Sequence, residues 1–227
     1  MHPFSLYLVT DPVLGGGREK VPGIVAAAVR GGVTCVQIRD KSGTDAQVAE
    51  CALATREALR EAGFSEVPIF INDRCEVART HHFHLHVGQT DAPYAQVRRA
   101  LPGDLMVGLT VGSHTELESS LTRIESAEVP LPAVLGIGPV WLTPTKVEAG
   151  SGLGPDEVAA IARRGHERGI DSVAIGGIHP DTVGAVYGVD GICVVSEIMA
   201  APDPAAAARE LLSQWRHTTR DNPAAAC

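Results

Sequence analysis

Residues 33–72, VTCVQIRDKSGTDAQVAECALATREALREAGFSEVPIFIN, carry the pattern that decides the fold. Apolar and β-branched residues fill 33–39 and 67–72, which we predict as strands, and an alanine-rich amphipathic segment at 45–62 predicts a helix between them. Two strands joined through a helix make a parallel βαβ unit. The apolar runs are nearly unbroken, as expected for strands buried on both faces.

The same unit repeats outward from this stretch along most of the chain. Further strands are predicted at 4–10, 83–87, 105–111, 133–138, 172–176 and 190–195, and further helices at 93–101, 114–127, 155–168 and 203–215. Eight strands alternating with helices in 227 residues predict a single (β/α)8 TIM barrel, an α/β fold. We assign 1–215 to the barrel as the catalytic domain and expect 216–227 to be a disordered C-terminal tail.

An open doubly wound sheet is the rival architecture. It usually carries a G-x-G-x-x-G motif after its first strand, because the glycines let the backbone approach a pyrophosphate. Here the first strand is followed by Thr10-Asp11-Pro12, and Gly15-Gly16-Gly17 comes later without that spacing. The barrel is therefore the preferred prediction.

Composition excludes several classes of partner. The formal net charge is −8 and the sequence has no Lys/Arg run, so nucleic-acid binding, which needs clustered positive charge, is not expected. Five cysteines without a C-x-x-C pair indicate reduced thiols, most of them in the core. Because the sequence shows no signal-peptide pattern and no segment near ~20 apolar residues, we expect a cytoplasmic protein without a membrane partner.

The second predicted strand ends in a cluster of polar side chains. A βα barrel carries its chemistry at the C-terminal ends of its strands, and this strand ends in Gln37-Ile38-Arg39-Asp40-Lys41. The spacing puts Gln37, Arg39 and Lys41 on one face. Two cations and an amide suit a multiply charged phosphate. An ion pair with Asp40 or another carboxylate is the alternative.

Two aspartates follow the next two strands. Asp73 comes directly after the third strand, and Asp91 ends the segment His86-Val87-Gly88-Gln89-Thr90-Asp91 after the fourth. Neighbouring strands lie ~4.8 Å apart, so the two carboxylates could share one cation. Mg²⁺ takes one or two carboxylates and completes its shell with water and substrate phosphate. Each aspartate taken alone could instead be a helix N-cap.

The last three strands end in groups suited to a second phosphate. The loop after the sixth strand holds Thr143, Pro144, Thr145 and Lys146, which read as a polar pocket floor or, alternatively, as a surface turn stiffened by proline. The seventh strand ends in glycines that include Gly177, and the eighth ends in Val195 and Ser196 at a helix start. Glycines and a helix N-terminus at these two strands form the recurrent phosphate site of this fold. Glycines needed only for close packing are the alternative.

The histidines at 81–86 offer a further metal pattern. His84 and His86 alternate with Phe83, Leu85 and Val87 along a strand, so core positions are preferred to a transition-metal site. The role of the cluster from His81 to His86 stays open.

Taken in order, these segments resemble thiamine-phosphate synthases. The resemblance rests on LYLVTD, VQIRDK, INDR, HVGQTD, GPVWLTPTK, AIGGI and DGICVVS, which span residue 6 to about 200. It implies a transferase that joins 4-amino-2-methylpyrimidine-5-ylmethyl diphosphate to a thiazole phosphate, or to its carboxylated form. The products are thiamine phosphate and diphosphate, and one Mg²⁺ ion is required. How many subunits assemble stays open, and a homo-oligomer is one possibility.

The resemblance also implies roles for individual residues. It assigns Mg²⁺ to Asp73 and Asp91, and catalysis at the diphosphate to Arg39, Lys41 and Lys146. It assigns to the pyrimidine diphosphate the three catalytic cations together with Gln37, Ile38, Asp40, Asn72 and Thr110. It assigns to the thiazole phosphate Thr143, Pro144, Thr145, Gly177, Val195 and Ser196.

The chain departs from the family pattern in two places. Thr110 stands where the family commonly has serine, and the His82-Phe83-His84 region replaces a usual A-D-G. A thiazole tautomerase with the same barrel is the enzymatic alternative, but it typically has histidine where this chain has Pro139. A barrel that binds thiamine precursors without catalysis is the alternative from a different class.

Overall fold

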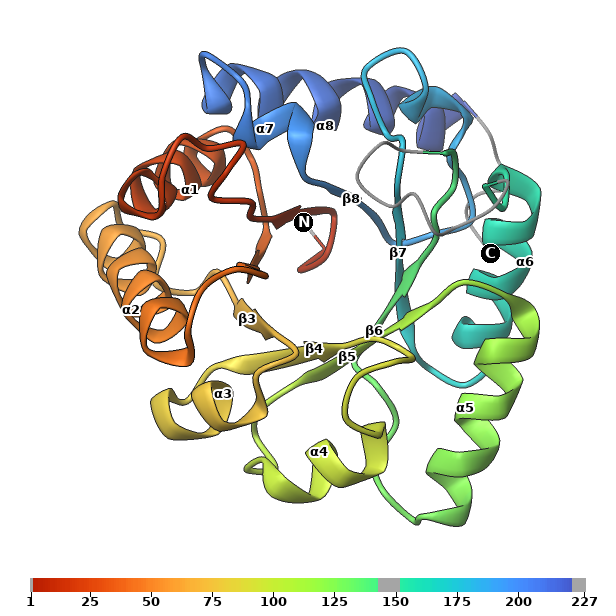
Figure 1. Cartoon of the computed structure of the whole chain (residues 1–227). Coiled ribbons are helices and arrows are strands. Elements are labelled where there is room, and N and C mark those ends of the chain that lie inside the picture. The colour runs from red at the N-terminus through yellow and green to blue at the C-terminus, as the bar shows by residue number, and fades with distance from the viewer. Residues whose placement is uncertain (1, 143–151, 222–227) are drawn as a thin grey trace.

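Eight parallel strands close into a barrel in the computed structural model, which describes residues 2–142 and 152–221 (Figure 1). The strands are β1 (Leu6–Val9), β2 (Cys35–Ile38), β3 (Ile69–Asn72), β4 (His84–Val87), β5 (Val107–Val111), β6 (Val134–Ile137), β7 (Asp171–Ile175) and β8 (Gly191–Val194). β1 pairs with β8, where Leu6 lies opposite Ile192, and this pairing closes the ring. The predicted (β/α)8 fold is therefore confirmed, each strand lying within one residue of its predicted range.

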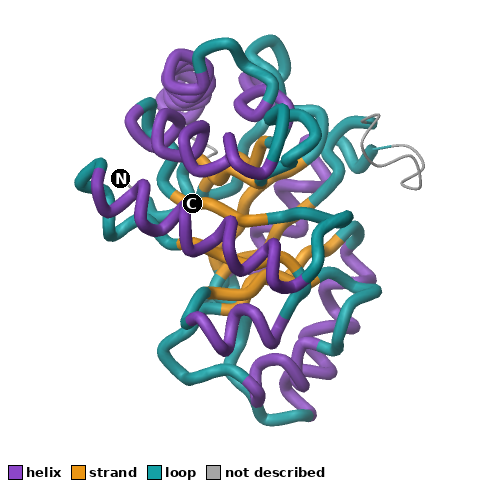
Figure 2. The backbone as a smooth tube through the Cα atoms, turned by 60° about the vertical axis from the view of Figure 1, so that its left-hand side comes forward, coloured by secondary structure: helices purple, strands orange, loops and turns teal. Residues whose placement is uncertain are grey.

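Helices surround the strand ring (Figure 2). They are α1 (Val21–Arg30), α2 (Asp45–Glu61), α3 (Cys75–His81), α4 (Tyr94–Ala100), α5 (His114–Ser126), α6 (Pro155–His166), α7 (Ser196–Met199) and α8 (Pro204–Asp221). β7 and β8 are joined through a 3₁₀ turn, η2 (Val183–Ala185), and α8 packs against this turn and against α1. No described helix is both long enough and apolar enough to cross a membrane.

The last helix runs further than the sequence predicted. α8 continues to Asp221, so 216–221, which we expected in the tail, have a helical backbone, and 222–227 lie outside the described residues. Trp215, where the predicted helix ended, is 6% exposed. The prediction stopped there because it relied on apolar periodicity, which locates the end of a helix only to within a few residues.

The barrel interior is apolar at one end and polar at the other. Side chains alternate in and out along each strand, and Tyr7, Cys35, Phe70 and Cys193 pack together in one buried inner cluster. Two residues further along their strands, Gln37 and Asn72 have the same inward parity. The polar positions therefore lie towards the C-terminal ends of the strands, where the candidate site is expected.

Candidate active site

Asp73 and Asp91 meet at the barrel mouth. Asp73 leaves β3 in the left-handed region, with φ 63°, and its N–H donates to the carbonyl of His86 on β4 (2.9 Å). Aspartate tolerates this conformation better than most residues. The Asp91 carboxylate accepts the Gly88 N–H (2.7 Å) and lies within hydrogen-bonding range of the Asp73 carboxyl. The backbone thus turns two carboxyl groups from neighbouring strands towards each other.

Neither aspartate is a helix N-cap. α3 begins at Cys75 with Arg74 as its N-cap, and α4 begins at Tyr94 with Pro93 as its N-cap. The alternative that each aspartate merely caps the following helix is therefore wrong.

The pKa of Asp73 is raised to about 7. Burial is the largest cause, because it disfavours the charged form, and the neighbouring Asp91 carboxyl adds to it. The Asn72 side chain, whose Nδ2 donates to Asp73 Oδ2 (2.5 Å), and the charge of Arg39 act in the opposite direction. Because its pKa is raised, the Asp73 carboxyl would become fully ionised near neutral pH only when a further cation lies beside it.

A residue that directly follows β1 holds the backbone at the C-terminal end of β2 in place. Thr10 is fully buried, and its Oγ1 accepts the N–H of Arg39 (3.0 Å) and donates to the carbonyl of the same residue (3.3 Å). Gln37 is 5% exposed and donates to the hydroxyl of Tyr7 inside the barrel (3.1 Å). Arg39 is half-buried near Asp73, and Lys41 is exposed. Sequence reasoning missed Thr10, although a threonine ending an apolar strand was the available signal.

The side chains of Ile38 and Asp40, which come from the same strand end, make contacts within the fold. Ile38 is buried in the outer core between the strands and the helices. The Asp40 carboxylate accepts Arg18 Nε, the N–H and hydroxyl of Ser42 (both 3.0 Å) and the N–H of Gly43 (2.9 Å). Burial would raise the pKa of Asp40, but these donors outweigh it and the pKa lies below its usual value. Both side chains are thus engaged in structure, and the ion-pair partner of Asp40 is Arg18, not Arg39 or Lys41 as the alternative supposed.

Arg74, which the sequence did not single out, holds the loop after β2 in place through hydrogen bonds. Arg74 donates through Nη2 to the carbonyls of Gly43 (2.6 Å) and Asp40 (3.3 Å), and through Nη1 to Asp45 (2.5 Å). The segment after β2, with Lys41, is in this way tied to the segment after β3, with Asp73.

A buried histidine lies beside Asn72 in the barrel interior. His86 pairs with Asn72 in register, is 5% exposed, and its Nε2 lies 2.9 Å from Thr110 Oγ1. Two glycines make room for its ring: a Cβ on Gly108 would stand 2.4 Å from His86 Nδ1, and one on Gly136 would stand 3.4 Å from the ring. Thr110 is thus positioned by a histidine that only strand registry identifies.

The ends of β7 and β8 also converge. Gly176 and Gly177 have φ 100° and 69°, and a Cβ on Gly177 would stand 2.7 Å from that of Trp141. Both backbone conformation and close packing therefore require these glycines. His179 Nδ1 lies 2.8 Å from Glu197 Oε1, which joins the β7 loop to α7. Val195 is the N-cap of α7 and Ser196 its first residue. Thr143, Pro144, Thr145 and Lys146 lie outside the described residues.

The four histidines of the 81–86 segment have separate partners. His82 Nε2 lies 2.9 Å from Asp104 Oδ2 at the surface, whereas His84 Nδ1 accepts the N–H of Met106 (3.0 Å) inside the barrel. His86 lies against Thr110, and the His81 carbonyl accepts Arg56 Nη1 (3.0 Å). The predicted alternation along β4 is confirmed.

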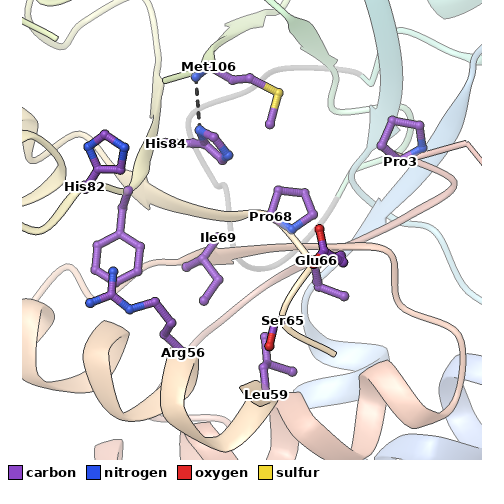
Figure 3. Close-up of a pocket in the computed structure, with 12 residues that line it drawn as sticks. Pro3, Arg56, Leu59, Ser65, Glu66, Pro68, Ile69, His82, His84 and Met106 are labelled. Carbon is purple, nitrogen blue, oxygen red and sulfur yellow. Dashed lines mark hydrogen bonds between the residues drawn. The ribbon is translucent and has the colours of Figure 1, made fainter. Parts of the chain in front are cut away.

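A cavity of about 380 Å³ opens at the opposite end of the barrel (Figure 3). It is lined by the starts of β3, β4 and β5, including Ile69, His84 and Met106, with Arg56 stacked 4.6 Å over the Phe83 ring. Barrel enzymes use the other, C-terminal end for chemistry. This cavity therefore belongs to the structural end of the barrel.

His84 in this cavity predicts a pH dependence of stability. Burial lowers its pKa to about 4, below the usual ~6.5. Between these values the unfolded chain binds more protons than the folded one, so the free energy of unfolding falls as pH drops from 6.5 towards 4. Allowing for its partial exposure, we expect His84 to contribute ~1–2 kcal/mol of this fall.

Urea unfolding at pH 7.5 and pH 5 measures this contribution. The difference between the two pH values should be smaller in His84→Gln than in the wild type, while His81→Gln, which replaces another histidine of the same segment, should keep the wild-type difference. An unchanged difference in His84→Gln would contradict the prediction.

The sequence is similar to known proteins over most of its length. The family model "Thiamine monophosphate synthase" matches residues 6–198. The chain is 50% identical to the thiamine biosynthesis multifunctional protein ThiED of Corynebacterium efficiens over 95% of this chain, although it spans only 29% of that protein. It is 39% identical to the thiamine-phosphate synthase of Albidiferax ferrireducens, covering 93% of this chain and 91% of the relative.

A solved structure agrees with the sequence comparisons. The thiamine phosphate pyrophosphorylase from Pyrococcus furiosus superposes with a TM-score of 0.78 at 28% identity, covering 95% of this chain and 97% of that one. The family match extends over most of the barrel, and a relative more than 30% identical is matched over nearly its whole length. The chain therefore belongs to the thiamine monophosphate synthase family.

Proposed function

We propose that this chain is a thiamine-phosphate synthase whose catalytic domain is the barrel, residues 1–215. It would join the pyrimidine diphosphate to the thiazole phosphate, or to its carboxylated form, and release diphosphate. The observation that carries the proposal is the meeting of the Asp73 and Asp91 carboxyl groups beside Arg39 at the mouth of a barrel of this family.

The two aspartates fit one Mg²⁺ ion. Carboxylate oxygens are the ligands that this hard cation prefers. The raised pKa of Asp73 reflects burial next to a like charge, and a divalent cation would relieve that repulsion. When bound, the ion would neutralise part of the charge on the diphosphate oxygens.

The chain's own cations complete the diphosphate site in this proposal. Arg39, held at its backbone by Thr10, would contact the diphosphate together with Lys41 and Lys146. Breaking the bond between the pyrimidine methylene and the bridging oxygen leaves negative charge on that oxygen, and fixed cations there lower the barrier. Asn72, Gln37 and Thr110 would orient the pyrimidine, with Thr110 positioned by His86.

The second substrate would approach from β7 and β8. Gly177, Val195 and Ser196 would hold the thiazole phosphate with Thr143, Pro144 and Thr145, at strand ends where this fold binds phosphate. The substitution would be dissociative: the carbon–oxygen bond breaks first, diphosphate leaves with its electron pair, and the thiazole nitrogen then attacks the methylene carbon of the aminopyrimidinylmethyl cation through its own lone pair. It carries no proton to remove, so no general base is needed for bond formation.

One assay tests the function directly. We expect the purified chain, given both phosphorylated substrates and Mg²⁺, to form thiamine phosphate and diphosphate, and to stop when EDTA is added. Chromatography of the thiazole and thiamine species is the readout. Isomerised thiazole without coupling would indicate a tautomerase, and tight substrate binding without product would indicate a non-catalytic binding protein; either result contradicts the proposal.

A further inference from the structure

A cluster of histidine and aspartate side chains lies at the end of the barrel opposite Asp73 and Asp91. His2 precedes β1, Asp171 is the first residue of β7, and Asp190 directly precedes β8. One potential ligand atom from each of the three lies within 4.8 Å of the others, and His2 Nε2 is 3.5 Å from Asp171 Oδ1. Segments far apart in sequence thus bring a nitrogen and two carboxylate ligands to one place.

Asp190 is held in place by its neighbours. Its Oδ2 accepts the Ser172 N–H (2.8 Å) and lies 2.7 Å from Nε2 of His166, at the end of α6. The Ser172 hydroxyl also donates to it (3.3 Å). Outer hydrogen bonds of this kind orient metal-binding carboxylates and reduce the ordering needed when an ion binds.

The cluster contains no permanently charged cation. Within the described part of the chain, the salt-bridge partners of the two carboxylates are His2 for Asp171 and His166 for Asp190. Histidine is usually neutral above pH ~6.5. Two carboxylates therefore lie within 4.8 Å of each other without an arginine or lysine partner among the described residues.

We propose that His2, Asp171 and Asp190 form a second divalent-metal site, suited to a transition ion such as Zn²⁺, that fastens the N-terminal segment to β7 and β8. An imidazole nitrogen and carboxylate oxygens are ligands that zinc binds, with water in the fourth position of an open site, whereas Mg²⁺ prefers oxygen ligands alone. Tetrahedral ligands ~2.0 Å from zinc stand ~3.3 Å apart, close to the 3.5 Å found between His2 and Asp171.

The histidine must change its tautomer for this site to form. Nδ1 of His2 accepts the Phe4 N–H over a long 3.3 Å, which leaves the ring proton on Nε2. Metal binding at Nε2 moves that proton to Nδ1 and exchanges this weak contact for a metal–nitrogen bond. The strong contacts of Asp190, which all go to Oδ2, need not change.

Cobalt(II) titration tests the site in protein without a tag. The experiment uses chelator-treated Asp73→Asn/Asp91→Asn protein, so that the proposed magnesium site is removed, and follows the visible absorption of Co²⁺. We expect one Co²⁺ per chain with a four-coordinate spectrum that Zn²⁺ abolishes. Adding His2→Gln or Asp171→Asn should weaken Co²⁺ binding at least about tenfold.

A surface histidine–aspartate pair provides the matched control. His82 and Asp104 form a similar pair away from the cluster, so His82→Gln in the same background should leave the titration unchanged. Zn²⁺ should also raise the Tm of the background variant but not that of the variant carrying His2→Gln. Equal Co²⁺ affinity with and without His2, or a six-coordinate spectrum in every variant, would overturn the proposal.

Discussion

Asp73→Asn is expected to lower kcat/KM for thiamine phosphate formation by about 10²–10³-fold or more, the size of effect seen when a fixed electrostatic contact to the reacting atoms is removed. Asparagine keeps the shape of the side chain and tolerates the left-handed backbone at φ 63°. The charge that would hold the ion is lost. Steady-state kinetics at increasing Mg²⁺ concentration measures the effect, and Asp91→Asn should fall in the same range.

The same substitution is expected to stabilise the protein when no metal is present. The raised pKa of Asp73 means that ionisation above its unfolded value of ~3.9 opposes folding. After discounting for partial exposure, removing this charge should increase the free energy of unfolding at pH 8 by ~1 kcal/mol. A gain in Tm together with a loss of activity would separate this residue from one that merely supports the fold.

Asp104→Asn is the control for both measurements. Asp104 is an exposed aspartate before β5 that pairs with His82 at the surface, at the end of the barrel opposite the site. Its replacement should leave kcat/KM within about twofold of the wild type, as is usual for an exposed ion pair. Wild-type turnover by Asp73→Asn at saturating Mg²⁺ would refute its role as a metal ligand.

Arg39→Met is expected to lower kcat/KM by about 10²-fold or more. Its guanidinium is half-buried beside Asp73, and its backbone is held by Thr10, so a side-chain change removes a diphosphate contact and leaves the strand end in place. The kcat/KM of Arg39→Lys should lie between those of the wild type and Arg39→Met, because lysine keeps the charge but not the paired hydrogen bonds. Kinetics with the pyrimidine diphosphate as varied substrate measures both variants.

Arg56→Met is the matched control for this series. Arg56 stacks over Phe83 at the opposite end of the barrel, so its loss should affect stability and leave kcat/KM within about twofold. If Arg39→Met kept the wild-type KM and kcat, the diphosphate site would have to lie elsewhere.

Sequence patterns were sufficient for the architecture and for the end of the barrel at which the candidate site residues lie. Alternation of short apolar runs with amphipathic helices predicted eight strands because burial on both faces leaves a direct mark on composition. The same patterns placed Asp73 and Asp91 after neighbouring strands, but could not decide between a metal site and two helix caps. The capping residues exclude the caps, because α3 and α4 begin at Cys75 and Tyr94, beyond either aspartate, and the metal site stays a proposal.

Side-chain contacts that depend on how neighbouring strands align could not be predicted from the sequence. The sequence singled out His86 only as part of a possible metal pattern, because its contact with Thr110 and its fit against Gly108 and Gly136 depend on how β4, β5 and β6 align. The contacts of Asp40 were hidden from the sequence for a related reason. A carboxylate beside Arg39 and Lys41 resembles a ligand-binding group, yet its oxygen atoms are engaged by Arg18, Ser42 and Gly43.

By itself, the sequence determined the barrel, its strand order and the end at which polar groups collect, because the period of buried residues and the right-handed βαβ connection depend on local chain geometry. Only the tertiary structure decided which side chains meet. It joined Asp73 to Asp91, and it joined His2 to Asp171 and Asp190 at the other end. The second of these contacts depends on ring closure, where β1 pairs with β8 and brings residues from the two ends of the barrel sequence together, and no local pattern encodes that distance.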